Sequence, residues 1–260
     1  MSVYVEILLR APLDAIWSHT QTPGLHERWD LRFSRIDYLP KAAHDAPQRF
    51  RYTTRIGFGV EVSGQGETVG QCGRADGSAA SALKFGSEQR LSIIREGSGY
   101  WKYVPTSEGV RFLTWYDYRT RFGAGGAFFD RLLFRPLIGW ATAWSFDRLR
   151  LWLEERMEPQ HAARNAVVHF VARTTLAAIF ANKGLVPQLT GLGIVDVIFA
   201  LALLSSWCRA WPVWICAIEA ACNPSSLSPA VAALAAIDLV VLPGVPSASR
   251  CLRRPPSEKP

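Results

Sequence analysis

The sequence predicts an α+β domain, in which an antiparallel sheet wraps around one long helix, followed by an all-α transmembrane domain of about four helices. Residues 123–157 carry apolar side chains at helical spacing, and alternating strand patterns dominate the residues before them. From residue 165 to residue 248, long apolar blocks contain only six charged residues. This change in composition marks the boundary between two domains.

The first domain is expected to begin with a strand over residues 2–10, followed by a short helix over residues 12–19 that opens on Pro12. Thr22-Pro23-Gly24 opens a second short helix, which ends near Trp29. Strands are then expected at residues 31–39, 48–58, 60–69, 83–85, 90–96, 100–105 and 110–121, with a loop of small residues at 70–81. The strand at 48–58 alternates in the way typical of an antiparallel sheet with one face in water.

The long helix of residues 123–157 is expected to lay a broad apolar stripe against this sheet. The stripe consists of Phe129, Leu133, Leu137, Trp140, Trp144 and Leu151. Phe146, Leu149 and Leu153 fall on the other side, where they either meet a second partner or are scattered exposed residues. Pro136 is expected to kink the helix, because its ring removes a backbone donor and crowds the preceding turn.

Charge and cysteine content exclude several classes of function. The net charge is +7, but the basic residues are dispersed and no nucleic-acid recognition signature occurs, so no nucleic-acid partner is expected. The five cysteines form no CxxC pair and have no histidines at metal-ligand spacing, so neither a disulfide framework nor a metal site is expected. Glu6 and Arg10 interrupt the N-terminal apolar residues, which predicts no signal peptide and a cytoplasmic first domain.

Three stretches of the first domain carry a family resemblance. They are APLDAIWSHTQTPGLHERWD, FSRIDYLP and FFDRLLFRPLIGWATAWSFDRLRLWLEE. With them, residues 1–158 resemble the START-like or SRPBCC superfamily of helix-grip proteins, which includes polyketide cyclases and lipid-transfer domains. The resemblance implies a cavity for a hydrophobic ligand between the sheet and the long helix.

Aromatic residues are dense in the predicted strands, and a pocket of this kind needs apolar walls with a few polar groups that orient the ligand. The candidate ligand-binding residues are Trp29, Phe33, Tyr52, Thr54, Trp101, Tyr103, Trp115, Asp117 and Arg119. Asp117 and Arg119 are two residues apart on one strand and therefore share a face. The alternative is that the aromatic residues are core and that Asp117 and Arg119 form a surface cross-strand pair.

Catalysis has weaker support in the sequence. His19, His26 and His44 lie in the first domain, and the stretch from His26 to Asp30 resembles an acid/base cluster, but adjacent helical residues do not face each other. No GxSxG, HExxH or Walker motif occurs, and the glycines at 123–126 lack the spacing of a phosphate-binding loop. We therefore predict no catalytic residues and no cofactor.

The second domain, residues 165–248, contains four apolar blocks. They cover residues 171–189, 192–207, 211–221 and 229–242, of which the first has the length of a membrane span and the others are short. Arginines lie before the first block, between the second and third, and after the fourth. Four spans with both ends in the cytoplasm satisfy the positive-inside rule, which predicts a multi-pass protein of the inner membrane.

Polar residues inside the blocks are candidates for function. They are Lys183, Asp196, Glu219 and Asp238, and the alternative is that the acids lie near headgroups at the ends of short helices. The stretches ARTTLAAIFANKGLVPQL and GLGIVDVIFALALL are similar to the DoxX-like family of four-helix membrane proteins. Residues 249–260 are expected to be a disordered basic tail.

These observations favour a membrane-anchored protein that binds a hydrophobic ligand such as a lipid, a quinone or a polyketide-like molecule. One alternative is an enzyme, a cyclase or dehydratase with a membrane anchor. Another is a soluble protein whose last hundred or so residues form an ordinary helical domain. Convergence of Asp117, Arg119 and a histidine on the pocket would favour chemistry, whereas aromatic walls would favour binding. The sequence indicates no protein partner.

Overall fold

The computed structural model describes residues 2–41, 43, 45–57, 59–73, 75, 77–185, 198–199, 201, 211–222, 231–232, 244–248 and 251. The chain divides into two compact units, of which the first comprises residues 1–160 and 246–260 and the second comprises residues 161–245. The segment that follows residue 245 therefore belongs to the same unit as the N-terminus.

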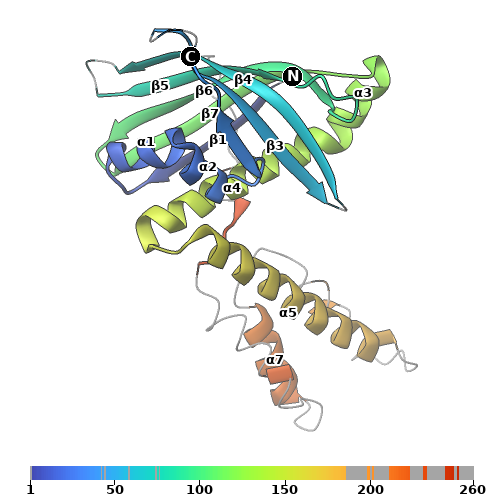
Figure 1. The fold of residues 1–260 in the computed structure, drawn as a ribbon. Helices are drawn as coiled ribbons and strands as arrows, with labels where there is room; N and C mark the ends of the chain where they lie inside the picture. The colour runs from blue at the N-terminus through green and yellow to red at the C-terminus, as the bar shows by residue number, and fades with distance from the viewer. Residues whose placement is uncertain are drawn as a thin grey trace. The chain divides into compact units, whose positions relative to one another are not determined.

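In its described part, the first unit contains a seven-stranded antiparallel sheet in the order β1-β7-β6-β5-β4-β3-β2 (Figure 1). The strands are β1 (Ser2–Leu9), β2 (Arg35–Tyr38), β3 (Arg49–Gly57), β4 (Val60–Gly73), β5 (Ala79–Gly86), β6 (Ile94–Thr106) and β7 (Gly109–Thr120). The pairing shifts register between Arg55 and Gly57, between Thr68 and Gly70, and between Ile94 and Glu96. Such bulges bend strands, and the sheet curves accordingly.

A long helical segment lies against the inner face of this sheet. It consists of α3 (Gly123–Phe129), a π-helical turn η1 (Asp130–Phe134) and α4 (Arg135–Glu155). Two shorter helices, α1 (Leu13–Gln21) and α2 (Pro23–Trp29), connect β1 to β2. The Arg148 side chain donates to the carbonyl of Arg28, and the Ser145 hydroxyl accepts from the amide of Leu31, so α4 is also tied to α2. This is the helix-grip arrangement that the sequence predicts.

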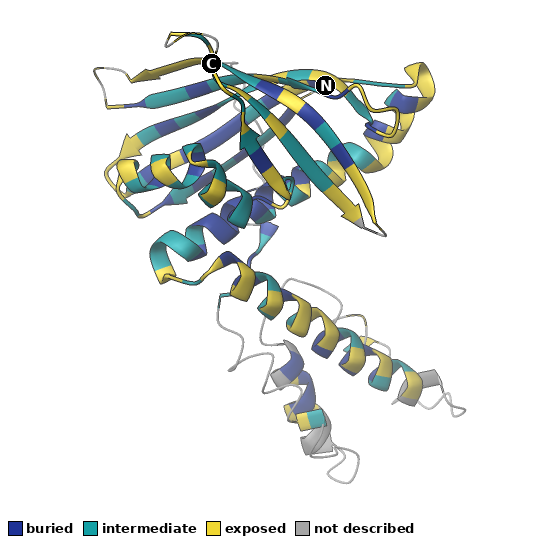
Figure 2. Cartoon of the chain, viewed as in Figure 1, coloured by how far each residue is buried: buried dark blue, intermediate teal, exposed yellow. Residues whose placement is uncertain are grey.

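Only the second half of the long helix packs into the core, and its most buried residues include two that the sequence analysis places off the apolar stripe. Phe146 and Leu149 are completely buried, and the Phe146 ring stacks on Phe112 of β7 at 4.5 Å between ring centres. In contrast, Phe129 and Leu133 are 43% and 53% exposed, and Figure 2 shows the α3 end of the helix as mostly exposed. The prediction that Phe129 and Leu133 pack against the sheet is therefore wrong, and Phe146 and Leu149 pack there instead.

Three further local predictions need correction. Most of the expected loop at 70–81 is strand, because the small residues of β4 pair with those of β5 up to Gly73 and Ala79. The strands expected at 90–96 and 100–105 are one strand, β6. The helix irregularity precedes Pro136, in η1, where the amide of Arg135 donates to the carbonyl of Asp130 five residues earlier.

The second unit contains α5 (Pro159–Leu185) and α7 (Trp211–Cys222) among its described elements. Leu176, Ala177 and Phe180 of α5 form a buried cluster with Ile215 and Cys216 of α7. No helix in the described residues is both long and apolar enough to span a bilayer. The first and third expected spans overlap α5 and α7, whereas most of the second and fourth lies outside the described residues.

The C-terminal segment at 246–251 belongs to the first unit. Its residues Ala248 and Cys251 are 8% and 0% exposed and join the core cluster of that unit. The tail expected at 249–260 thus contains a buried residue, Cys251, and residues 252–260 lie outside the described residues.

Candidate functional site

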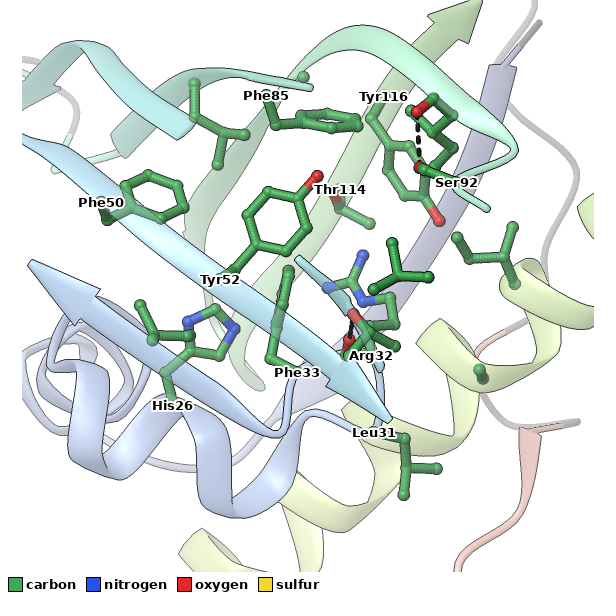
Figure 3. Close-up of a pocket in the computed structure, with 18 of the residues that line it drawn as sticks. His26, Leu31, Arg32, Phe33, Phe50, Tyr52, Phe85, Ser92, Thr114 and Tyr116 are labelled. Atoms are coloured by element: carbon green, nitrogen blue, oxygen red, sulfur yellow. Dashed lines mark hydrogen bonds between the residues drawn. The ribbon is translucent and has the colours of Figure 1, made fainter. Parts of the chain in front are cut away.

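A cavity of about 530 Å³ lies between the inner face of the sheet and the long helix (Figure 3). Its walls come from every second residue of the strands, such as Phe50, Tyr52 and Thr54 on β3 and Thr114 and Tyr116 on β7. Because side chains alternate between the two faces of a strand, this parity decides which residues reach the cavity. The lining is mostly aromatic and aliphatic, so the cavity suits an apolar molecule.

Glycines facing aromatic residues shape the sheet side of this cavity. The cross-strand pairs are Phe50 with Gly66, Tyr52 with Gly64, Phe85 with Gly97, and Tyr116 with Gly99. A Cβ atom at Gly66 would lie 2.2 Å from the Phe50 ring, and one at Gly99 would lie 2.4 Å from Tyr116 Cβ. Because these glycines have no side chain, the aromatic rings pack directly against the backbone of the sheet. The result is a broad aromatic wall.

Two arginines interrupt the apolar lining: Arg55, whose side chain is exposed and paired with Glu61, and Arg32. The guanidinium of Arg32 lies in the cavity among Phe33, Tyr52 and Tyr116 (Figure 3). Its Nε and Nη2 atoms donate to the two carboxylate oxygens of Asp30 at 2.9 and 2.6 Å. Asp30 is 1% exposed, and its Oδ2 also lies 3.0 Å from Nε2 of His26, which lines the cavity as well. Arg32, Asp30 and His26 therefore form a buried, charged polar corner at the cavity.

The charges of this corner are fixed by their mutual contacts. Burial alone would raise the pKa of Asp30, but the Arg32 guanidinium and the hydrogen bonds from Arg32 and His26 outweigh burial and hold this pKa well below its usual range. Burial would lower the pKa of Arg32, and Asp30 raises it above the usual value. Asp30 is therefore an anion and Arg32 a cation throughout the physiological pH range.

The tyrosine hydroxyls at the cavity are neutral hydrogen-bonding groups. Burial raises the pKa of Tyr52 to about 12, and its hydroxyl donates to the carbonyl of Gly86 at 3.3 Å. Burial also raises the pKa of Tyr116, although nearby Arg32 opposes that shift. The Tyr116 hydroxyl lies 3.1 Å from Thr142 Oγ1. Neither phenol is an anion at neutral pH, so both present neutral hydroxyl groups.

A second buried acid lies at the π-helical turn. Asp130 is completely buried, and its Oδ1 accepts from the Tyr118 hydroxyl at 2.5 Å. Its Oδ2 accepts from Nε and Nη2 of Arg135 at 3.0 and 2.5 Å. Burial, together with the adjacent Asp130 carboxylate, raises the pKa of Tyr118. These contacts fasten η1 to β7 close to Phe129, Leu133 and Phe134, which line the cavity.

The structure brings four of the predicted ligand-binding residues, Phe33, Tyr52, Thr54 and Trp101, into the cavity wall. Trp29 and Tyr103 are completely buried in the core and do not line the cavity. Trp115, Asp117 and Arg119 lie on the opposite face of β7, where Arg119 donates to Glu96 at 3.2 Å. The strand parity that places Thr114 and Tyr116 inside places these three residues outside.

The candidate intramembrane residues cannot be placed. Asp196 and Asp238 lie outside the described residues, and the side chains of Lys183 and Glu219 are likewise not described. Among the residues that the structure describes, no group of three or more His, Cys, Asp or Glu side chains could hold a metal ion.

Of the polar corner, the stretch from His26 to Asp30 is noted but set aside in the sequence analysis, and Arg32 is not included. His26 and Asp30 are four residues apart and therefore face each other on α2, which the spacing alone indicates. Arg32 follows Asp30 by two residues in an extended turn, a spacing that also allows a contact. The signal was present, but nothing in the sequence shows that this corner is buried in the cavity rather than on the surface.

No family model matches the chain. A protein of Bacillus subtilis (strain 168), called an uncharacterized membrane protein, YndG, is 44% identical over 212 residues, which cover 80% of this chain and 79% of that protein.

Solved structures of similar fold include a STAR-related lipid transfer protein from Xanthomonas axonopodis. It is 15% identical, with a TM-score of 0.44, and covers 58% of this chain and 84% of that one. The Zhui aromatase/cyclase of Streptomyces sp. R1128 is 13% identical, with a TM-score of 0.39, over 58% of this chain and 96% of that one. The helix-grip arrangement itself follows from the strand order and the long helix of this chain.

Proposed function

Because the chain belongs to the family of the Bacillus subtilis membrane protein YndG, we propose that it is a membrane-anchored protein whose first unit binds a flat, mainly apolar ligand. The ligand class would be a lipid, a quinone or a polyketide-like molecule. The observation that carries the proposal is the cavity of about 530 Å³, a volume within the range of small-molecule sites. Its aromatic wall favours a flat ligand, and Arg32 supplies a polar group that can orient one.

The second unit would supply the anchor. The support comes from the relative that is called a membrane protein and from the apolar blocks between residues 165 and 248. A DoxX-like arrangement of four spans with the first unit in the cytoplasm fits the distribution of arginines around these blocks. An alkaline wash of membranes that contain the full chain tests this part of the proposal. Protein that remains in the washed membrane supports the anchor, and protein that washes off contradicts it.

Ligand binding is tested with N-phenyl-1-naphthylamine, a neutral flat probe that fluoresces in apolar surroundings. The full chain is expected to bind it with micromolar affinity. Leu83 of β5 lines the cavity, so Leu83→Trp is expected to fill part of the space and weaken probe binding by at least about tenfold. Fluorescence titration of both proteins provides the measurement.

Lys84→Trp is the matched control, because Lys84 is the next residue on the same strand and is exposed on the opposite face. Probe affinity is expected to stay within about twofold of the original. Equal weakening by the two substitutions would mean that the probe does not occupy the cavity.

A second candidate function is catalysis by His26, which the 3.0 Å contact with Asp30 supports. Solvent extracts of the purified protein and of its His26→Gln variant separate the two functions by mass spectrometry. The same bound molecule in both extracts supports binding alone. A bound molecule that is chemically altered only when His26 is present supports an enzyme.

A further inference from the structure

The opening of the cavity is surrounded by large apolar side chains that also reach solvent. Six large apolar or aromatic residues both line the cavity and are more than 40% exposed. One of them is Tyr38 of β2, and we call the other five the rim patch: Ile56, Leu91, Phe129, Leu133 and Leu137. They come from the end of β3, from the segment between β5 and β6, and from the long helix. Exposed apolar groups that gather at a cavity opening mark an interaction surface rather than scattered exposure.

The same helix continues the apolar surface beyond the opening. Phe128 and Leu132 are 71% and 70% exposed, and Trp140 is 45% exposed. Figure 2 shows this α3 end of the helix as a largely exposed segment. A helix that is secured on one side and apolar on the other needs a partner for the second side. The contacts of Asp130 with Tyr118 and Arg135 secure the first side.

The charged residues near the rim patch have a positive balance, because Arg55, Arg90 and Arg131 outnumber the exposed acids Glu61, which pairs with Arg55, and Glu88. Arg131 is exposed on the helix between Phe129 and Leu133, and Arg90 is exposed beside Leu91. The acid in this part of the helix, Asp130, is completely buried and bound by Arg135. An apolar helical surface flanked by arginines matches an anionic lipid surface, in which the apolar groups enter the acyl region and the cations meet headgroups.

We propose that the rim patch, together with Phe128, Leu132 and Trp140, docks on an anionic bilayer, so that the ligand passes between lipid and cavity without crossing water. This proposal goes beyond ligand binding, and it rests on the proposed function in that the cavity is where the ligand binds. A second copy of this chain is a less suitable occupant, because a two-fold contact would bring Arg131 close to its own copy. A lipid surface has no such repulsion.

The first test requires no ligand. The full chain is combined with vesicles of phosphatidylcholine and phosphatidylglycerol whose acyl chains carry bromine, which quenches tryptophan on contact. Quenching is measured for the original protein and for Trp140→Phe, and the difference between the two is the quenching of Trp140. The double variant Phe128→Glu/Leu132→Glu retains Trp140 and is expected to lose that quenching, because two carboxylates cannot enter the acyl region. Val69→Glu, an exposed apolar position on β4 outside the rim patch, is expected to retain it.

Charge is tested in the same experiment. Arg131→Glu, or vesicles of phosphatidylcholine alone, are each expected to weaken the quenching of Trp140 by at least about fivefold, which corresponds to ~1 kcal/mol per basic residue near an anionic surface. Quenching that is the same with and without phosphatidylglycerol would overturn the anionic part of the proposal. Quenching of Trp140 that survives Phe128→Glu/Leu132→Glu would overturn the docking surface.

A second measurement links the surface to the cavity. Transfer of N-phenyl-1-naphthylamine from vesicles to the protein is followed by stopped-flow fluorescence. Leu83→Trp, which is expected to bind the probe weakly, gives the background signal. Phe128→Glu/Leu132→Glu is expected to slow the transfer about tenfold and to leave the final amplitude unchanged. If the probe does not bind at all, the ligand-binding function fails while the quenching result still decides the docking surface. If the double variant instead dissociates a dimer and leaves quenching unchanged, the occupant is a second copy and the proposal is wrong.

Discussion

Replacement of Arg32 by Met is expected to lower the free energy of unfolding of the first unit by about 3–5 kcal/mol, because it leaves the carboxylate of Asp30 buried without its cation. The Asp30 side chain is completely buried, so water cannot replace the two hydrogen bonds that Arg32 donates. His26 and the backbone amide of residue 32, which donates to Oδ1 at 3.0 Å, would remain as partners, but neither replaces the guanidinium. Urea unfolding followed by tryptophan fluorescence measures the change.

The pH dependence of this effect has a defined sign. In the original protein, the pKa of Asp30 is lower in the folded state than in the unfolded state. The ion pair therefore contributes its full stability above the unfolded value of about 3.9, and the contribution declines as pH falls toward the folded value. In Arg32→Met the burial of Asp30 acts without the opposing cation and raises its pKa. The difference in stability between the two proteins is accordingly expected to be large at pH 7 and to shrink on acidification.

Arg35 and Asp37 provide a matched control. They form an ion pair at the same two-residue spacing, with 71% and 43% of their side chains exposed. Arg35→Met is expected to change the free energy of unfolding by no more than about 0.5 kcal/mol, because exposed ion pairs contribute little. The double variant Asp30→Asn/Arg32→Met is expected to recover part of the loss, since it removes the unpaired charge. Equal effects of Arg32→Met and Arg35→Met would contradict the interpretation that the buried carboxylate of Asp30 needs the Arg32 cation for stability.

Much of the fold of the first unit could be predicted from local patterns. The alternation in residues 48–58 and the helical periodicity after residue 123 indicate the strand and the helix that the structure contains. The errors arise where tertiary contacts replace local signals. The sequence predicts two strands, at 90–96 and 100–105, where the structure has the single strand β6; Gly97 and Gly99, which lie between the predicted strands, pair with Phe85 and Tyr116.

The candidate site depended on strand parity, which the sequence does not determine. On β7 the aromatic residues Trp115 and Tyr116 are adjacent, so apolar character does not show which of them faces the core. Asp117 and Arg119 share the face of Trp115 and lie outside, whereas Tyr116 and Thr114 lie inside. The polar group of the cavity is instead Arg32, which lies just after α2 and outside the strands.

Contacts between distant parts of the chain are a second limit of sequence reasoning. The sequence predicts a disordered basic tail at residues 249–260, with Arg253-Arg254-Pro255-Pro256 in it. In the structure the amide of Ser247 donates to Asp147, a residue one hundred positions earlier, at 2.6 Å. The indole of Trp144 donates to the carbonyl of Pro246 at 2.8 Å. Neither contact has a local sequence signature.

These contacts predict that the end of the chain stabilises the first unit. Deletion of residues 246–260 is expected to lower its free energy of unfolding by roughly 3–5 kcal/mol. The deletion removes the charge-assisted bond to Asp147, the bond from Trp144 and the acceptor at Cys251 for the amide of Glu6, and it uncovers core around Ala248. A protein cut after Glu158 lacks the same contacts and also the Pro159 carbonyl that accepts from Arg148 at 3.1 Å, so it should lose at least as much stability. Differential scanning calorimetry is the appropriate measurement, because two units need not unfold together.

A point substitution separates the bond to Asp147 from the rest of the segment. Ser247→Pro removes the backbone donor and leaves Asp147, which is completely buried, with Arg150 at 2.6 Å as its remaining charged partner. The expected loss is roughly 1.5–3 kcal/mol. Ser247→Ala keeps the backbone donor and should unfold within about 0.5 kcal/mol of the original. If the deletion and Ser247→Pro both unfold like the original, the segment only rests on the first unit, and residues 1–158 would then be a self-sufficient ligand-binding domain.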